Sequence, residues 1–162
     1  MSIEAKTGLV VVASHYESGG QRAEELMEAA VQSMKDRMVV PAVGSKTVWD
    51  AADAIDVCKE FKEQGVDSLT VILSTWVTDS LLYVLVHEMQ IPVVFWAVPY
   101  TETFSIGCVQ HFGSALTTHG IPYDYVYGLT NDKAAADKVA KIAEVGRIMK
   151  AVGNMKLALV GP

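Results

Sequence analysis

The sequence has few cysteines and no clustered basic residues, and both absences exclude classes of protein. Its two cysteines, Cys58 and Cys108, are far apart and form no CxxC pair. That pattern argues against a disulfide framework and favours a reducing compartment. The 13 Lys and Arg side chains are outnumbered by 19 Asp and Glu and form no basic run. The chain therefore lacks the charge pattern of a nucleic-acid-binding protein.

Long apolar runs and targeting signals are also missing. The first apolar run, GLVVVA at residues 8–13, is too short for a membrane span or a signal-peptide core, and no positively charged leader precedes it. We therefore expect a cytoplasmic protein without membrane contact. The chain also lacks a GxGxxG fingerprint and a Walker lysine, which disfavours a nucleotide site.

Two further chemistries lack their residues. No metal site can be assembled from the local spacing of His, Cys, Asp and Glu, since His111 has only Cys108 three or four residues away. A phosphate-receiving domain needs an aspartate at the end of its third strand, where this chain has Leu73 and Ser74. We therefore predict no metal ligand and no phosphotransfer residue.

What the sequence does contain is a regular alternation of strand-like and helix-like segments. The β-branched runs at 9–13, 38–43, 69–73, 93–97 and 123–127 are each followed by a helical pattern. This alternation predicts a three-layer αβα, flavodoxin-like (Rossmann-like) domain with five parallel strands in the order 2-1-3-4-5. A chain of 162 residues can bury roughly 70% of its unfolded surface, which is enough for one core.

Three features of the helical and C-terminal segments lead to separate expectations. The second helix is expected to open at Thr47, with Asp50 three residues later as in a capping box. The third helix has consecutive apolar residues from Leu81 to Val86, so both of its sides should be buried. Since one side of a helix on a sheet normally faces water, we expect another subunit to cover it in a homo-oligomer. Residues 155–160 are expected to form a peripheral sixth strand.

The ligand site of such a sheet lies outside the carboxyl ends of its strands, where the strand order reverses. The loops at that edge are 14–20, 44–50, 74–80, 98–105 and 128–132, and all carry hydroxyl groups. Four of the five also carry an aromatic ring or an imidazole, a composition suited to a polyhydroxylated ligand. The candidate substrate-binding residues are His15, Tyr16, Glu17, Thr75, Trp76 and Tyr100.

Alternative interpretations are open for several of these residues. His15 and Glu17 alternate along an extended segment and could form an acid/base pair. They could equally be a satisfied loop histidine and a first-turn charge favoured by the helix dipole. Trp76 is either a ligand contact or a packing lid, whereas Trp49 is assigned to the core or an interface.

Five sequence blocks, in this order, are similar to the N-terminal domain of the L-fucose isomerase and L-arabinose isomerase superfamily. They are ASHYESGG (13–20), the block TVWDAADAIDVCKEFKEQGVDSLTVILSTW (47–76), IPVVFWAVP (91–99), SIGCVQHFGSAL (105–116) and KLALVGP (156–162). Together they span essentially the whole chain. Members of this superfamily interconvert aldoses and ketoses at a divalent metal, usually manganese.

The resemblance implies that residues 1–152 are the first domain of such an enzyme and that 153–162 begin a following domain. The metal ligands and catalytic carboxylates of the family belong to later domains, so this chain would hold no catalytic residue and no cofactor. Mn²⁺ is expected in the full-length enzyme. In the family, a polar residue after the first strand and an aromatic after the third help to close a neighbouring subunit's sugar site. These positions correspond to His15 or Tyr16 and to Trp76, although the family commonly has Arg or Gln at the first.

The sequence therefore favours a substrate-contacting, oligomer-forming domain of a sugar isomerase that is inactive by itself. Two alternatives stay open. The chain could be a complete flavodoxin-like protein with its own chemistry at His15 and Glu17, or a stand-alone module that binds a small molecule such as a sugar or a flavin.

Overall fold

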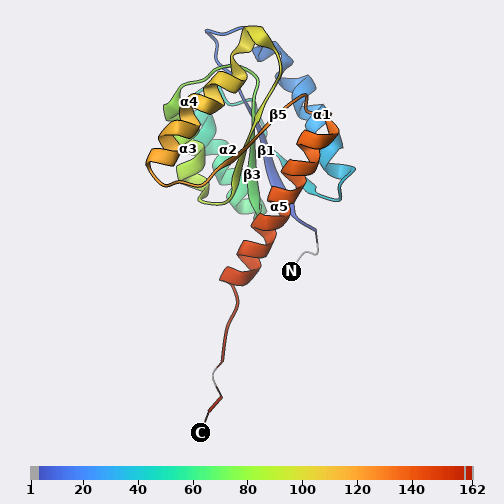
Figure 1. Ribbon diagram of the computed structural model, residues 1–162, viewed down its shortest axis with the longest axis vertical. Helices are drawn as coiled ribbons and strands as arrows, with labels where there is room; N and C mark the ends of the chain where they lie inside the picture. Colours follow the sequence, from blue (N-terminus) through green and yellow to red (C-terminus); the bar gives the residue numbers. More distant parts are fainter. Residues whose placement is uncertain (1–3, 159, 162) are drawn as a thin grey trace.

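The computed structural model describes residues 4–158, 160 and 161, and its centre is a five-stranded parallel sheet (Figure 1). The strands are β1 (Lys6–Val12), β2 (Val40–Val43), β3 (Ser68–Leu73), β4 (Val93–Ala97) and β5 (Asp124–Tyr127). They pair in the order β2-β1-β3-β4-β5, as the sequence predicted. The three central strands are nearly continuous runs of buried apolar residues, because helices cover both faces of the sheet.

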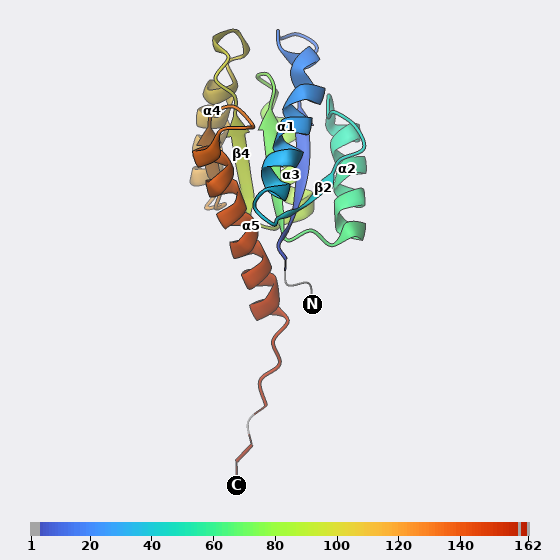
Figure 2. The same cartoon turned by 90° about the vertical axis from the view of Figure 1, so that its right-hand side faces the viewer.

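The helices divide between the two faces of the sheet (Figure 2). One face carries α2 (Ala51–Gln64), α3 (Asp79–Met89) and α4 (Ser105–Thr118), and the other carries α1 (Ala23–Lys35) and α5 (Lys133–Gly153). Short 3₁₀ turns, η1 (Gly20–Arg22) and η2 (Thr101–Thr103), precede α1 and α4. Fully buried Phe61, Leu82 and Phe112 pack between the sheet and the three-helix layer. The result is a three-layer αβα domain.

The apolar run on α3 is covered largely by its own chain. Leu81, Leu82 and Leu85 are buried, while Tyr83 and Val86 are half-buried against the same core. The Tyr83 ring meets Phe112 of α4 edge-on, with 5.0 Å between the ring centroids. Because α2 and α4 flank α3, much of the cover expected from another subunit is supplied internally. The homo-oligomer stays a prediction.

The start of α2 differs from the sequence prediction. Asp50 is the N-cap, and its Oδ1 accepts a hydrogen bond from the backbone N–H of Asp53 at 2.9 Å. Thr47 lies before the helix because the adjoining Val48 pairs with Val12 in a parallel bridge. The backbone N–H of Val48 donates to the Val11 carbonyl of β1, and its carbonyl accepts from the N–H of Ala13 just after the strand, which keeps the segment extended. The sheet bridge therefore delays the helix.

The prediction of a sixth strand at 155–160 is wrong for the residues of this segment that the structure describes. Leu159 lies outside the described residues. Helix α5 continues beyond the amino ends of the strands and carries the chain away from both edge strands (Figures 1 and 2). Residues 155–158 consequently meet no free strand edge and form no strand, and Leu157 is 89% exposed. The helix also exposes Val145, Ile148, Met149 and Val152 on its outer side.

Both cysteines should be unreactive in the folded protein. Cys58 and Cys108 are buried, and burial raises the pKa of each thiol to about 11. Since the thiolate is the reactive form, we expect Ellman's reagent at pH 8 to modify neither thiol in buffer and both in denaturing urea. Rapid modification of the native protein would show that one of the two helices opens easily.

Candidate functional site

Hydrogen bonds join the loops after β1, β3 and β4 at the carboxyl edge of the sheet. The backbone N–H of Ser14 donates to Thr75 Oγ1 at 2.8 Å, and the Ser74 hydroxyl donates to the Gly19 carbonyl at 2.6 Å. The backbone N–H of Trp76 donates to the Thr103 carbonyl at 2.8 Å. The point where the strand order reverses, between β1 and β3, is thus bridged by protein groups.

Thr75 has its hydrogen-bonding capacity used within this layer. The residue is fully buried, and its hydroxyl accepts from Ser14 and donates to the Trp76 carbonyl at 2.9 Å. Gly19 has φ +117°, and an added Cβ would lie 2.6 Å from Thr103 Cγ2. A side chain at this glycine would therefore be strained and would separate the loops. These contacts give the edge a fixed shape on which exposed side chains are displayed.

His15, Tyr16 and Glu17 lie at the exposed tip of the loop after β1. The His15 ring stacks on Trp49, with centroids 4.2 Å apart and an interplanar angle of 5°. Tyr16 is 97% exposed. No hydrogen bond or ion pair joins His15 to Glu17 in the described part of the chain, so this conformation does not form the acid/base pair. Trp49 is a half-buried edge residue packed against Gly20, where an added Cβ would lie 2.7 Å from the indole.

Tyr100 is covered by an arginine that the sequence did not single out. The guanidinium of Arg22, from η1, lies 4.1 Å from the centroid of the Tyr100 ring. Arg22 Nη2 also pairs with Glu102 Oε1 at 2.5 Å. The backbone N–H of Glu102, followed by Arg22, holds the pKa of that carboxyl below its usual value. One face of Tyr100 is therefore occupied by protein.

Trp76 belongs to a separate surface on the side of the sheet that α3 and α4 cover. Its half-buried indole lies against Gly107 of α4, where an added Cβ would be 3.5 Å from Cζ3. The ring is tilted by 39° against His111, with centroids 5.6 Å apart. His111 Nε2 is 3.2 Å from Asp79 Oδ2, so this pair links α4 to the first turn of α3.

Phe104 closes the other end of this surface. It is 65% exposed, and its Cδ1 lies 3.9 Å from the position of an added Cβ on Gly107. Its φ of +49° is uncommon for a bulky residue. We call Trp76, Asp79, Phe104, Gly107 and His111 the Trp76 shelf. The sequence showed no sign of the His111 contacts because Asp79 and Trp76 lie on other elements.

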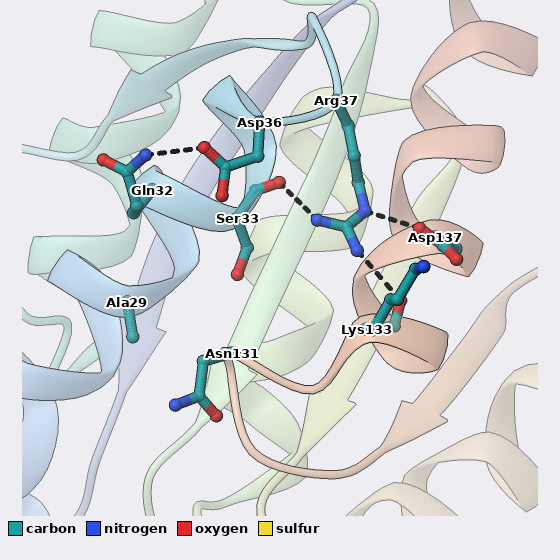
Figure 3. Close-up of a pocket in the computed structure, with 8 residues that line it drawn as sticks. All are labelled: Ala29, Gln32, Ser33, Asp36, Arg37, Asn131, Lys133 and Asp137. Carbon is teal, nitrogen blue, oxygen red and sulfur yellow. Dashed lines mark hydrogen bonds and ion pairs between the residues drawn. The ribbon is translucent and has the colours of Figure 1, made fainter.

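A cavity of about 570 Å³ lies away from this edge, between α1 and α5 (Figure 3). Its walls carry charges of both signs. Arg37 crosses it and donates to the carbonyls of Ser33 and Lys133 and to Asp137 Oδ1, at 2.7–3.0 Å. The arginine therefore ties the two helices together, and the groups around it favour no particular ligand. The cavity is lined by Ala29, Gln32, Ser33, Asp36, Arg37, Asn131, Lys133 and Asp137.

The described residues contain neither a metal-binding cluster nor a membrane-spanning helix. Among them, no three His, Cys, Asp or Glu side chains come close enough together to hold a metal ion. In the same part of the chain, no helix has the length and apolar character that crossing a bilayer requires.

The fold and this edge define an αβα domain of flavodoxin-like topology that displays an aromatic shelf at the carboxyl ends of its strands. No family model matches the chain, and no curated protein matches it. A solved structure of an ABC transporter solute-binding protein from Clostridium phytofermentas, with bound L-rhamnose, is distantly similar, with 13% identity and a TM-score of 0.42. The match covers 96% of this chain and 60% of that one, and a likeness this weak carries no functional argument.

Proposed function

We propose that this chain binds a sugar, or a similar polyhydroxylated molecule, at the carboxyl edge of its sheet, with the Trp76 shelf as the contact surface. The supporting observation is the position of Trp76. Its backbone N–H donates to the Thr103 carbonyl and its carbonyl accepts from Thr75 Oγ1, which fixes it in the loop after β3. Its indole is partly exposed beside a carboxylate and an imidazole. Parallel sheets bind their ligands at this edge.

The chemistry of the shelf suits a sugar because a sugar ring has two kinds of surface. Its C–H groups form an apolar face that can pack on an aromatic ring, as apolar groups do in most small-molecule sites. Its hydroxyl groups need donors and acceptors around the rim, which Asp79 and His111 can supply. A phosphate ligand would instead require exposed cations, and the shelf has no lysine or arginine.

We further propose that the chain acts as the substrate-contacting domain of a cytoplasmic aldose–ketose isomerase, on the strength of the ordered sequence blocks. In that arrangement, Mn²⁺ and the acid/base residues would come from other segments, and the sugar would be shared with a neighbouring subunit of a homo-oligomer. The exposure of Tyr16 and His15 is compatible with such a contact.

A stand-alone sugar-binding module is the second candidate. The observation that favours it is that all five residues of the Trp76 shelf belong to this chain and lie together in it. A module of this kind would bind its sugar with neither metal nor turnover.

Calorimetric titration of the chain with L-arabinose, L-fucose and L-rhamnose, with and without Mn²⁺, tests the proposal. We expect saturable, millimolar binding of at least one sugar that does not depend on Mn²⁺, and no conversion of aldose to ketose. No heat of binding from any of the three would refute the sugar-binding proposal. Conversion of the bound sugar would show instead that the chain is a complete enzyme.

A further inference from the structure

We infer that Asp79 and His111 form the polar, specificity-determining end of the Trp76 shelf, and that they recognise two neighbouring hydroxyl groups of a sugar ring stacked on Trp76. This inference rests on the proposed function, since it assigns the ligand groups that the proposed site reads. Asp79 begins α3 and His111 lies in α4. Of the two, only Asp79 belongs to a loop that the sequence singled out.

The pair has unused hydrogen-bonding capacity. His111 Nε2 is engaged with Asp79 Oδ2 at 3.2 Å. Within the described residues, neither Asp79 Oδ1 nor His111 Nδ1 makes a hydrogen bond. The His111 side chain is 60% exposed and that of Asp79 is 35% exposed, so the pair lies at the surface of the shelf.

Two free groups on a contacting pair of side chains can each take one of two hydroxyls on neighbouring carbons. A carboxylate oxygen accepts from one hydroxyl. His111, whose Nε2 lies 3.2 Å from Asp79 Oδ2, offers Nδ1 as the hydrogen-bonding atom for the second hydroxyl. Because the Asp79 contact fixes the ring of His111, Nδ1 is already oriented before the ligand arrives.

The other end of the shelf limits where the sugar ring can lie. Phe104 and Trp76 both approach Gly107, with their nearest ring atoms 3.9 and 3.5 Å from the position of its added Cβ. Gly107 therefore leaves the surface of α4 low between the two rings. A larger side chain there would project between them and occupy the space that the ligand needs.

The test measures affinity for whichever of L-arabinose, L-fucose and L-rhamnose binds the wild-type chain most tightly. We expect His111→Ala and Asp79→Asn each to weaken binding about tenfold, the scale of one lost hydrogen bond. The double variant should be little weaker than either single variant, because the two residues act as a unit. Gly107→Leu should abolish binding, and His119→Ala, an exposed histidine elsewhere on the molecule, should leave it unchanged.

Circular dichroism shows whether each variant is folded. If Gly107→Leu does not fold, the inference is tested by Asp79→Asn, which is isosteric, and by His111→Ala, which changes an exposed side chain. Wild-type affinity in both of these variants, with binding lost in Trp76→Ala, would overturn the inference while the proposed function stands. A failure of all three sugars to bind the wild type would overturn both.

Discussion

Trp76→Ala should lower the affinity for sugar at least tenfold and leave the domain folded. The indole is the larger of the two aromatic rings on the shelf and the one that lies beside Asp79 and His111, and Phe104 lies at the other end. Because Trp76 is only half-buried, its removal should cost about 1–2 kcal/mol of unfolding free energy, less than the ~3–5 kcal/mol typical of a fully buried tryptophan. Calorimetric titration and urea melts measure the two quantities.

Trp49→Ala is the matched control for this variant. Trp49 is also a half-buried tryptophan of the carboxyl edge, but its ring partner is His15. It should therefore lose comparable stability and keep its affinity for sugar. If Trp76→Ala binds as tightly as the wild type, or unfolds outright, Trp76 is a packing residue and the proposed site is wrong.

Gly146→Ala should destabilise the domain by about 3 kcal/mol, although alanine is the better helix former by about 1 kcal/mol. Gly146 lies where α5 packs directly on the chain entering β3. An added Cβ would be 2.2 Å from the carbonyl oxygen of Asp67 and 2.8 Å from its carbonyl carbon. These are backbone atoms that cannot rotate away. The helix would have to shift, which would disturb the contact of Lys150 Nζ with Asp67 Oδ1 at 3.0 Å.

Gly153→Ala provides the comparison on the same helix. Nothing lies within 4 Å of an added Cβ at that position, so the change should be neutral or stabilising by up to about 1 kcal/mol. Urea melts of the two variants separate the steric effect from helix propensity. Equal stability of Gly146→Ala and the wild type would mean that α5 does not pack as closely as described.

The strand order and the division into layers could be predicted from the sequence because they depend on short-range patterns. Buried parallel strands such as β3 appear as nearly continuous apolar runs, and α1 shows its buried face at three- and four-residue spacing. The start of α2 was displaced by three to four residues because the bridge between Val48 and Val12 is a tertiary contact. Local capping patterns carry no information about it.

The candidate site was predictable only in part, for the same reason. The carboxyl-edge rule identified Trp76 and Tyr100, but their neighbours come from other elements. His111 appeared isolated in the sequence because its partners, Asp79 and Trp76, lie 32 and 35 residues earlier (111 − 79 and 111 − 76). They meet it only through the packing of α3 against α4. Similarly, Arg22 reaches Tyr100 across the sheet edge.

The predicted sixth strand failed because an apolar alternation is necessary for a strand but not sufficient. Met155 and Leu157 have the pattern, yet pairing requires a neighbouring strand edge within reach. Helix α5 directs them away from both β2 and β5 (Figure 1). A prediction from sequence has no access to that direction, since it is set by how the whole helix packs.

The central claim, that sugar binds at Trp76, can be tested most directly through the indole N–H signals of the three tryptophans. Trp96 is fully buried, with its Nε1 donating to the Gly128 carbonyl at 3.1 Å, and it serves as an internal reference. In ¹⁵N-labelled protein titrated with L-arabinose, L-fucose or L-rhamnose, we predict a saturable shift of the Trp76 signal and an unchanged Trp96 signal. A Trp76 signal that does not move at saturating concentrations of all three sugars would contradict the account.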